Sequence, residues 1–558
     1  FEQAFTISIT DIVEDTTAPG RPTLTGPSLT NSVTVTGTAE AGSTVKVYYD
    51  LFWQQLGADI DGEAANDYSG TSVSLSSDGT VAAIGATHSD GNGGDSGHVR
   101  IYAWNGSAWQ QRGDDIDGEA ANDQSGKSVS LSSDGTVVAI GAQANDGNGT
   151  NSGHTRIYAW DGSAWVKRGA DINGEKSVDL SGFSVSLSSD GTLVAIGAFE
   201  NDANGNKSGH TRIYAWNGSA WQQRGGDIDG EAANDQSGYS VSLSADGIVV
   251  GIGARWNDGN GTNSGHTRIY AWNGSAWQQR GGDIDGEAEG DYSGFSVSLS
   301  ADGSIAAIGA YGNDGISGSG HTRIYAWDGS AWQQRGDDID GEAVNEWSGY
   351  SVSLSADGTA VAIGALLSGH TRIYTWDGSA WLKSGVDIVG EAAGDRAGTS
   401  VSLSADGTAV AIGALLNNDN GSNSGHVRIY QLSPLTLIGQ TTADANGDYN
   451  ITVSTLADGS HDITATATDT ANNTSVTSVA HTVVVDTTAP TITSAATGTD
   501  LAENSGAGQT VYTITASDAV GVASYAIGGT DAALLTLTGN VVSLDANPDY
   551  EIKFSYSF

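Results

Sequence analysis

The chain has 558 residues, of which 66 are Asp or Glu and 22 are Lys or Arg, and its formal net charge is −44. This charge excludes nucleic acid and anionic membrane surfaces as expected partners, because both attract basic proteins. Cysteine is absent, which excludes disulfide and thiol chemistry. No run of 18 apolar residues occurs, so we expect no membrane insertion.

Residues 1–15 read FEQAFTISITDIVED and alternate like a strand. They resemble the last strand of a cadherin-like module. Because the sequence starts within a strand pattern and without methionine, we expect a monomeric fragment of a longer chain. Residues 16–50 open on Thr-Thr-Ala-Pro and continue with short strand patterns, which we interpret as the first half of a split domain.

Residues 51–432 consist of seven copies of one repeat. Its Asp-Ile pair recurs at spacings of 56, 56, 56, 56, 55 and 49 residues. Each copy has four strand patterns: alternating SVSL, the continuous apolar run TVVAIGA, alternating HTRIYAW, and AWQQRGDDI after an Asn/Asp-Gly-Ser turn. Four strands repeated seven times predict a seven-bladed β-propeller.

The two ends of the repeat region complement each other. The region opens with FWQQLGADI, a fourth strand without the first three, and closes with three strands that lack a fourth. We therefore expect the opening strand to complete the last blade, which would close the ring and remove a sheet edge.

The repeated sequence SGxSVSLSxDGTxVAIGA, followed by NDGNGxNSGHxRIY, resembles the FG-GAP repeats of integrin-α-type propellers. The resemblance covers residues 51–432 and implies the propeller fold. One departure concerns calcium. The family's DxDxDG loop between the first two strands is reduced here to Ser-Asp-Gly or Ala-Asp-Gly, so the resemblance does not imply calcium at that loop.

Residues 433–486 contain PLTLIGQTTADANGDY and LADGSHDITATATD, and a second Thr-Thr-Ala-Pro follows them. Together with residues 16–50 they resemble one bacterial Ig-like domain that the propeller interrupts. Insertion at a loop tip is tolerated when the ends of the inserted domain lie together. The predicted fold is all-β: a seven-bladed propeller inserted into an Ig-like β-sandwich, plus a further β-sandwich.

That further sandwich spans residues 487–558 and resembles a truncated cadherin-like module, through the sequences LAEN, TASD and LDANPDYE. Tandem modules of these kinds resemble the extender regions of large secreted bacterial adhesins of the RTX type. The resemblance implies an extracellular, cell-surface location, a role in cell adhesion and biofilm formation, and calcium as a cofactor.

Two groups of oxygen-bearing residues are candidate calcium ligands. By resemblance to cadherin junctions, the first group is Asp11, Asp15, Asp486, Glu503, Asp518, Asp545 and Asp549; the alternative is that these are solvated linker charges. The second lies between the second and third strands, at Asp146, Asn148 and Asn151, with copies from Asp90, Asp202, Asp258 and Asp419. Oxygens at this spacing suit calcium, and the alternative is a Gly/Asn turn with exposed polar side chains.

Candidate ligand-binding residues lie where the copies differ, because binding residues favour variable loops on a rigid scaffold. Aromatic and charged residues gather there in copies three to six: Phe199, Glu200, Arg255, Trp256, Tyr292, Tyr311, Trp347 and Tyr350. Exposed aromatic rings beside single charges suit a surface glycan or peptide. The alternative is that the residues before SVSL, such as Phe183 and Phe295, pack between blades.

We interpret the chain as the non-enzymatic, ligand-binding and extender region of an adhesin. Catalysis has little support, because nearly every carboxylate recurs in each copy, whereas a hydrolase needs a unique acid and base. Two alternatives stay open. A polysaccharide-degrading enzyme requires two close, unique carboxylates in the central cleft, and a purely structural spacer requires no aromatic patch.

Overall fold

The structure, a computed structural model, describes residues 18–24, 29–30, 34–49, 53–313, 318–392, 394–433, 436–453, 456, 459–475, 478, 481–485, 488, 490–518, 522, 524–553 and 555–557. These residues form β-strands and a single short 3-10 turn, η1 (Ala532–Leu534). The chain divides into two compact units, residues 51–434 and residues 1–50 with 435–558. Within the described residues, no helix has the length and apolarity that a membrane span needs.

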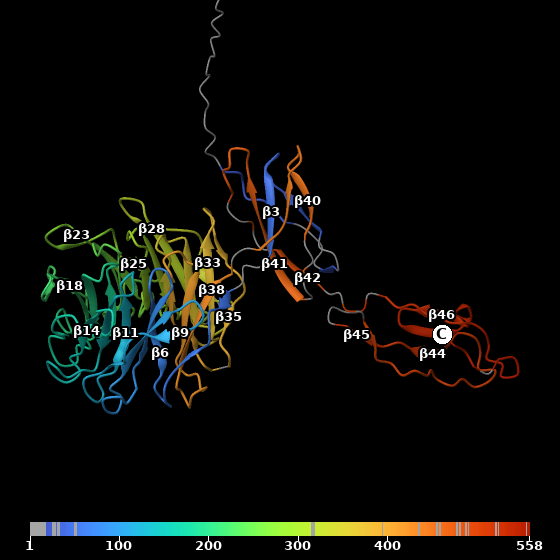
Figure 1. The fold of residues 1–558 in the computed structure, drawn as a ribbon, viewed down its shortest axis with the longest axis horizontal. Helices are drawn as coiled ribbons and strands as arrows, with labels where there is room; N and C mark the ends of the chain where they lie inside the picture. Colours follow the sequence, from blue (N-terminus) through green and yellow to red (C-terminus); the bar gives the residue numbers. More distant parts are fainter. Residues whose placement is uncertain are drawn as a thin grey trace, which may run out of the picture. The chain divides into compact units, whose positions relative to one another are not determined.

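The unit of residues 51–434 contains seven five-stranded sheets, called blades 1 to 7 in chain order (Figure 1). Blade 1 comprises β6 (Ser69–Leu75), β7 (Val81–Ala86), β8 (His98–Trp104), β9 (Trp109–Gln111) and β10 (Ile116–Asp117). Blade 2 comprises β11 (Ser125–Leu131), β12 (Val137–Ala142), β13 (His154–Trp160), β14 (Trp165–Lys167) and β15 (Ile172–Asn173). Blade 3 comprises β16 (Ser184–Leu187), β17 (Leu193–Ala198), β18 (His210–Trp216), β19 (Trp221–Gln223) and β20 (Ile228–Asp229).

Blade 4 comprises β21 (Ser237–Leu243), β22 (Val249–Ala254), β23 (His266–Trp272), β24 (Trp277–Gln279) and β25 (Ile284–Asp285). Blade 5 comprises β26 (Ser296–Leu299), β27 (Ile305–Ala310), β28 (His321–Trp327), β29 (Trp332–Gln334) and β30 (Ile339–Asp340). Blade 6 comprises β31 (Ser348–Leu354), β32 (Ala360–Ala365), β33 (His370–Trp376), β34 (Trp381–Lys383) and β35 (Ile388–Val389). Blade 7 combines β36 (Ala397–Leu403), β37 (Ala409–Ala414) and β38 (His426–Leu432) with β4 (Trp53–Gln55) and β5 (Ile60–Asp61).

The second strand of each blade is buried on both faces, which explains its continuous apolar sequence. In β7, Ala82 and Ile84 pack toward blade 7, whereas Val81 and Ala83 pack toward blade 2. The hydrophobic core of the propeller therefore lies in the seams between blades. This arrangement is the packing that the repeated TVVAIGA run predicts.

The fourth strand differs from its prediction. The segment AWQQRGDDI forms two short strands that both pair with the third strand, so a blade has five strands instead of four. The break falls at Gly113, whose φ is +85° and whose Cβ position lies 2.9 Å from Trp160 Cζ3. Only glycine fits there, because a side chain would be strained and would strike the next blade.

Hydrogen bonds between the first strands of neighbouring blades run around the whole ring. The backbone N–H of Leu131 donates to Ser74 Oγ of the preceding blade at 3.0 Å, and the same bond recurs at every blade boundary. The series ends where Leu75 N–H donates to Ser402 Oγ of blade 7 at 2.9 Å. The repeated serines of SVSL thus join the blades into a closed ring.

The ring closes through the opening strand. β4 and β5 pair with β38, in the register Leu432↔Trp53 and His426↔Asp61 (Figure 1). The predicted seven-bladed propeller, closed by residues from both ends of the repeat region, is confirmed by this pairing.

The Trp pairs hold neighbouring blades together at the turn between the third and fourth strands. The ring centroids of Trp104 and Trp109 are 5.5 Å apart, and Trp109 Nε1 donates to the carbonyl oxygen of Leu56 in the previous blade at 2.7 Å. The guanidinium of Arg112 lies 4.8 Å from the ring centroid of Trp160. Cation–π and hydrogen-bond contacts of this kind recur between blades, so these tryptophans belong to the framework.

The other unit contains an Ig-like sandwich built from both sides of the propeller in sequence. One sheet has the order β1 (Leu29–Thr30), β42 (His481–Val485), β41 (Gly459–Thr468), β3 (Thr44–Tyr49) and β39 (Thr436–Thr442). The second pairs β2 (Thr34–Thr38) with β40 (Asp448–Thr452). Val45, Val47, Tyr449 and Ile463 are among the residues of their common core. The chain enters the propeller after β3 and returns in β39, which pairs with β3 directly.

The C-terminal part of this unit is also β-structure. β44 (Gln509–Thr513), β47 (Val541–Leu544) and β46 (Leu535–Thr538) form one sheet, and β43 (Thr491–Ile492) pairs with β45 (Ala516–Ser517). A small core forms around Ile514, Leu535, Val542 and Leu544.

Candidate ligand-binding site

Two loops of every blade meet at one end of the propeller, because successive antiparallel strands alternate in direction. They are the loop between the second and third strands and the loop leading into the next first strand. We call this end the variable end, because three positions on it change from blade to blade. From blade 1 to blade 7, these positions hold Tyr68, Gln124, Leu180, Gln236, Tyr292, Trp347 and Arg396; Thr71, Lys127, Phe183, Tyr239, Phe295, Tyr350 and Thr399; and Thr87, Gln143, Phe199, Arg255, Tyr311, Leu366 and Leu415.

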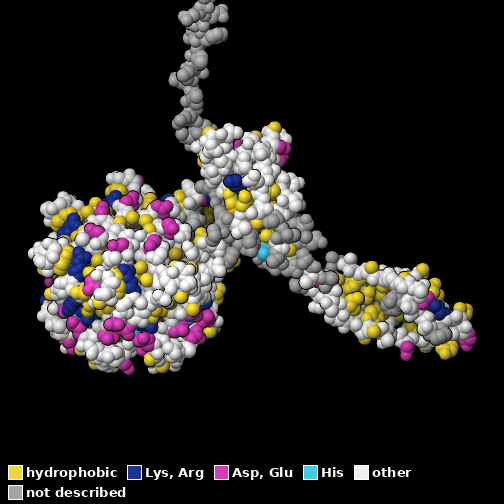
Figure 2. Space-filling model, viewed as in Figure 1, with side chains coloured by type: hydrophobic (Ala, Val, Ile, Leu, Met, Phe, Trp, Pro, Cys, Tyr) yellow, Lys and Arg dark blue, Asp and Glu magenta, His cyan; other side chains and the backbone are white. Residues whose placement is uncertain are grey.

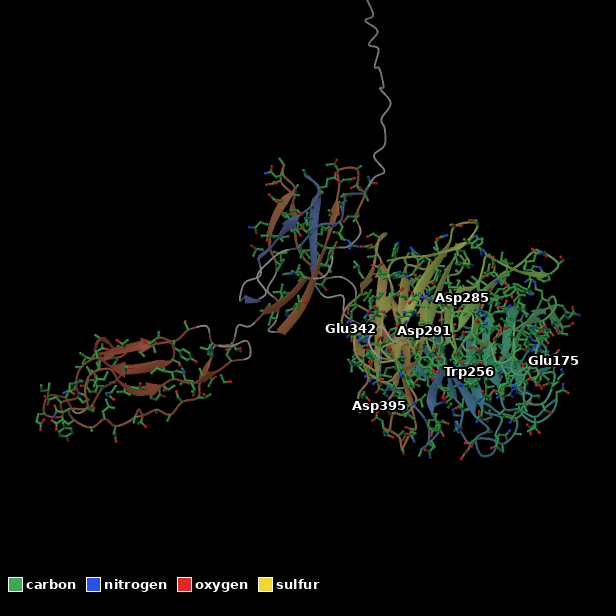
Figure 3. The ribbon with its side chains drawn as sticks, turned by 180° about the vertical axis from the view of Figure 1, so that it is seen from behind. Glu175, Trp256, Asp285, Asp291, Glu342 and Asp395 are labelled. Carbon is green, nitrogen blue, oxygen red and sulfur yellow. The ribbon has the colours of Figure 1, made fainter. Side chains whose placement is uncertain are left out.

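The first of these positions has the same unusual backbone in all blades. Its φ lies between +53° and +59°, although none of the seven residues is glycine. The left-handed conformation costs an L-residue about 1–2 kcal/mol. A buried loop acid stabilises it: Asp291 Oδ2 accepts N–H groups of Glu287 and Ala288 at 3.0 and 2.8 Å, and Asp395 occupies the same place in blade 7 (Figure 3). The scaffold therefore fixes the backbone from which the variable side chains project.

Aromatic rings from blades 3 to 6 form one continuous cluster at the variable end. Ring centroids lie 4.7 Å apart for Phe183 and Tyr239, 4.9 Å for Tyr239 and Phe295, and 4.7 Å for Phe295 and Tyr350. The outer members continue it, because Tyr311 lies 5.1 Å from Trp347 and is stacked on Tyr292 at 5.2 Å.

Two cations lie against this cluster. The Arg255 guanidinium is 3.8 Å from the ring centroid of Tyr239 and 4.8 Å from that of Trp256, and its Nε donates to Gln236 Oε1 at 2.9 Å. Lys127 Nζ is 4.5 Å from the Phe183 centroid. Burial, and then repulsion from Arg255, lowers the pKa of Lys127 to about 8. Lys127 and Arg255 thus place two positive charges against the aromatic cluster, although the loops of the same end also carry acidic residues such as Asp291 and Asp395.

Beside the aromatic cluster, the variable end contains a cavity of about 310 Å³ over blades 7, 1 and 2. Its lining is Tyr68, Thr71, Thr87, His88, Gln124, Lys127, Gln143 and Leu415. His88 Nδ1 is 2.9 Å from Thr87 Oγ1, and Gln143 Nε2 donates to Gln124 Oε1 at 2.6 Å. The lining combines one ammonium group with hydroxyl, amide and aromatic groups, and none of its eight residues is Asp or Glu.

The structure brings seven of the eight predicted ligand residues into the aromatic cluster or against it: Phe199, Arg255, Trp256, Tyr292, Tyr311, Trp347 and Tyr350. Trp256, labelled in Figure 3, is half-buried. Phe199 is only 6% exposed, because it packs edge-on against Phe183, so it supports the cluster from below. Glu200 forms an ion pair with Lys207 at 3.0 Å and is not a lone charge.

Sequence reasoning left several residues of this end out of the candidate set. Phe183, Tyr239 and Phe295 form the middle of the aromatic cluster, and Lys127, Tyr68 and Gln124 line the cavity. The sequence could have identified these residues, because each occupies a position shortly before SVSL that varies between copies. The alternative that Phe183 and Phe295 pack between blades agrees with the structure, since both contact aromatic rings of the next blade.

The loop between the second and third strands uses its polar atoms internally. Asp146 Oδ1 accepts the Asn151 N–H at 2.7 Å, and Asn148 Nδ2 donates to the carbonyl oxygens of Gly174 and Glu175 at 3.0 and 2.9 Å. These bonds match the turn alternative. Calcium at these three residues stays a prediction.

One alignment within this loop was wrong. In blade 7 the residue that corresponds to Asp146 is Asn418, because Asn418 Oδ1 accepts the N–H of Asn423 at 2.8 Å. Asp419 therefore corresponds to Gly147 of blade 2 and not to Asp146.

The candidate calcium ligands outside the propeller are only partly within the described residues; Asp11, Asp15 and Asp486 lie outside them. Glu503 and Glu551 share a hydrogen bond, which, with burial and the nearby Asp549, raises the pKa of Glu503. Asp545 and Asp518 are exposed or half-buried residues of the same module. The structure thus brings the carboxylates of Glu503, from the LAEN sequence, and Asp549, from the LDANPDYE sequence, close enough to repel each other.

Comparisons with known proteins identify two kinds of domain. The family model of the FG-GAP repeat matches residues 116–158, 228–270 and 390–430. These three segments of the propeller are similar to the FG-GAP repeat. The model of a bacterial Ig-like domain matches residues 418–487, a segment that begins in blade 7 and includes β39 to β42. No curated protein matches the chain.

The solved structures that match this chain share little sequence with it. Hydrazine synthase of Kuenenia stuttgartiensis is 11% identical, with 68% of this chain and 97% of that chain covered and a TM-score of 0.44. The β-propeller domain of Cps50 (Swd1) from Myceliophteria thermophila is 12% identical, with coverage of 68% and 100% and a TM-score of 0.44. The periplasmic gluconolactonase PpgL of Pseudomonas aeruginosa is 12% identical, with coverage of 79% and 100% and a TM-score of 0.41.

The family matches indicate repeats of a non-enzymatic kind. FG-GAP repeats and Ig-like domains together are consistent with an extracellular region that is adhesin-like or structural.

Proposed function

We propose that this chain is the ligand-binding and extender region of an extracellular bacterial adhesin, and that the variable end of the propeller binds a surface glycan carrying acidic groups. The observation that supports this most is the aromatic cluster beside a cavity that contains a lysine and no carboxylate. Aromatic faces stack on the apolar faces of sugar rings. The cavity offers the amide and hydroxyl groups that would hydrogen-bond sugar hydroxyls.

The acidic character of the ligand is inferred from charge. Lys127, Arg255 and Arg396 are three of only 22 basic residues in the chain, and all three belong to the variable positions. Figure 2 shows Lys and Arg side chains interspersed with Asp and Glu side chains on the visible face of the propeller, although the chain as a whole has three acidic residues for each basic one. Opposite charges steer a ligand to such a site. A peptide ligand is the alternative that the same surface leaves open.

The two other functions fit the variable end less well. A polysaccharide-degrading enzyme needs two close carboxylates, and the described lining of the cavity contributes none. A spacer has no reason to gather a continuous cluster of half-buried aromatic rings at the end where loops vary, because apolar surface left at such a place favours association. Calcium binding at the acidic positions of residues 503–549, and a contribution to biofilm formation, belong to the same proposal.

The test is a glycan array probed with the complete chain and with the variant Trp256→Ala/Trp347→Ala. We expect the chain to be retained by acidic glycans, and the double variant to lose at least about tenfold in apparent affinity, which corresponds to about 1.4 kcal/mol. Val166→Ala is the matched control, because Val166 is 50% exposed on β14, outside the variable end. Melting temperatures of all three proteins should agree within a few degrees, since both tryptophans are only half-buried and lie in loops outside the cores between the blades.

Three outcomes contradict the proposal. They are retention by no glycan, retention that the double variant keeps, and retention by peptides in place of glycans on a parallel peptide array.

A further inference from the structure

The side chains around His426 in blade 7 form a cluster that ligand binding at the variable positions does not use. His426 Nδ1 lies 3.8 Å from Asp59 Oδ2, 3.9 Å from Glu391 Oε2 and 3.8 Å from Asp419 Oδ2. Asp61 joins them: one ligand atom each from Asp59, Asp61, Asp419 and His426 all lie within 4.8 Å of one another.

Two buried atoms of this cluster have no hydrogen-bond partner among the described residues. They are Nδ1 of His426, whose side chain is 1% exposed, and Oδ1 of Asp61. A buried polar atom without a partner costs about 1–3 kcal/mol, and such an atom in a native fold calls for an ion or water that completes it. The cluster is open to solvent on one side, because the side chains of Asp419 and Glu391 are 54% and 39% exposed.

The charges of the cluster are not balanced by its own cations. Arg428 Nη1 lies 3.9 Å from Glu391 Oε1, and Arg100 Nη2 is occupied by the backbone oxygen of Asp61 at 2.6 Å. Four carboxylates therefore share these two guanidinium groups. Crowding of this kind is relieved when a cation binds.

In two other blades, a lysine ammonium group lies beside the acidic residues that correspond to Asp59 and Glu391. In blade 6, Lys383 Nζ contacts Asp387 and lies 3.1 Å from Glu342 Oε1. In blade 2, Lys167 contacts Asp171 in the same way and lies 3.5 Å from Glu119 Oε1. Blade 7 has Gln55 at this position, and its neutral amide bonds to Asp59. The protein thus supplies an ammonium group in two blades and none in blade 7.

Asp419 makes blade 7 different from the other blades without a lysine. The loops of blades 1, 3 and 4 carry Gly91, Ala203 and Gly259 where blade 7 carries Asp419. The additional carboxylate points into the cluster, where Asp419 Oδ2 accepts a hydrogen bond from Asn417 Nδ2 at 3.2 Å. In blade 7 the carboxylate of the loop is therefore moved by one position, from that of Asn418 to Asp419, where it joins the cluster, and no lysine balances it.

We propose that Asp59, Asp61, Asp419 and His426 bind a divalent transition-metal cation, Mn²⁺ or Zn²⁺. An imidazole nitrogen suits Zn²⁺ and carboxylate oxygens suit Mn²⁺, so a mixed set favours these metals over Ca²⁺, which prefers oxygen alone. Metal–ligand bonds of about 2.0–2.2 Å place opposed ligands about 4 Å apart. The observed spacing within 4.8 Å needs only small side-chain movements to reach it.

The position of this site gives it a structural consequence. Asp59 and Asp61 belong to the segment that precedes blade 1, whereas Asp419 and His426 belong to the last blade. The metal therefore cross-links the two chain segments that close the propeller ring. Because the unfolded chain cannot present these ligands together, binding stabilises the native state.

The test uses the complete chain after removal of metal with a chelator. Isothermal titration with MnCl₂, ZnCl₂ and CaCl₂ measures affinity and stoichiometry, and thermal melting measures stability. We expect Mn²⁺ or Zn²⁺ to raise the melting temperature by about 3 °C or more at a hundredfold excess over Kd. Asp419→Gly introduces the residue found in blades 1 and 4. This variant should bind one tightly held metal ion fewer per chain than the wild type. Gln55→Lys introduces the lysine found in blades 2 and 6. This variant should also lose the metal ion of blade 7, and its metal-free chain should melt at a higher temperature than the metal-free wild type.

Gln334→Lys in blade 5 is the matched control, because Gln334 Nε2 bonds to Asp338 at 2.6 Å as Gln55 bonds to Asp59. This variant should still bind the metal ion of blade 7. The proposal is overturned if neither Mn²⁺ nor Zn²⁺ binds, if Ca²⁺ binds more tightly than both at the site that Asp419→Gly removes, or if Asp419→Gly and Gln55→Lys retain every site of the wild type.

Discussion

The indole nitrogen of Trp53 donates a hydrogen bond of 3.1 Å to the carbonyl oxygen of Ser384, 331 residues later in the chain. The bond repeats one between consecutive blades, where Trp109 Nε1 donates to Leu56 at 2.7 Å. Trp53 is 8% exposed and packs into the core between blades 6 and 7. Trp53 therefore makes, for the last blade, the contact between blades that Trp109 and its equivalents make elsewhere.

Trp53→Ala should strongly destabilise the propeller. Removing a buried tryptophan costs about 3–5 kcal/mol in unfolding free energy, and here it also loosens the ring closure. Trp53→Phe should cost less, because it keeps most of the apolar area while losing the hydrogen bond. Guanidinium unfolding checks this, with Trp256→Ala as the half-buried comparison. If Trp53→Ala costs no more than Trp256→Ala, the opening strand does not hold the ring.

The Ig-like domain should fold without the propeller. β3 and β39 are antiparallel neighbours, and Tyr49 pairs with Thr436, so a two-residue Asn-Gly turn between them makes an ordinary hairpin. The shortened chain should give a β-sheet circular dichroism spectrum and a cooperative melt. Val47→Asp in the same chain, which places a charge in the core, should abolish the melt. A shortened chain without cooperative unfolding would show that the two halves need the propeller.

Acid should weaken the propeller through its buried histidines. Burial, and then Arg212 and Arg268, lowers the pKa of His210 and His266 to about 4. In the unfolded chain histidine titrates near 6.5. The unfolded state then binds more protons between these values, so the stabilisation is complete above about pH 6.5 and is lost as the pH falls to about 4.

The measurement is the melting temperature between pH 7 and pH 4.5 for the wild type and for His210→Gln. Burial raises the pKa of Asp229 and Asp285, and these groups act in the opposite direction. Comparison of the two proteins isolates the histidine contribution. We expect a smaller loss of melting temperature with acidification in the variant. Equal losses would mean that His210 takes up its proton as easily in the folded state.

Binding of an acidic glycan should weaken as the pH rises from 7 to 9. Lys127 lines the cavity, and its pKa is about 8, so its ammonium group loses its proton within this range. Lys127→Arg keeps the charge, because arginine remains protonated, and should bind with little pH dependence. Binding titrations at pH 7, 8 and 9 decide between the two. The same decline in both proteins would assign the pH dependence to another group.

Most of the fold follows from the sequence pattern. The period near 56 residues, the apolar TVVAIGA run and the incomplete copies at both ends predict the blades and the closure that β4 and β38 display. The two-piece fourth strand was not predicted, because its break depends on how closely Gly113 approaches Trp160 of the next blade. Contacts between blades are invisible to a pattern within one repeat.

The candidate site was predictable in part for the same reason. Variation between copies identifies the positions of Arg255, Trp256 and Trp347, because it needs only the aligned repeats. It does not reveal that Phe199 is covered by its neighbours, or that Lys127 borders a cavity. The cluster at His426 was missed because its members come from both ends of the propeller and because Asp419 was aligned one position away from its place.

Hydroxyl-radical footprinting of the complete chain, with and without the acidic glycan that the array retains best, tests the central claim most directly. Ligand binding at the variable end predicts that Tyr68, Tyr292, Trp256 and Trp347 become protected, while Trp104 and Trp109 at the opposite end keep their reactivity. Protection confined to the Trp104–Trp109 end, or the same reactivity with and without the glycan, would contradict it.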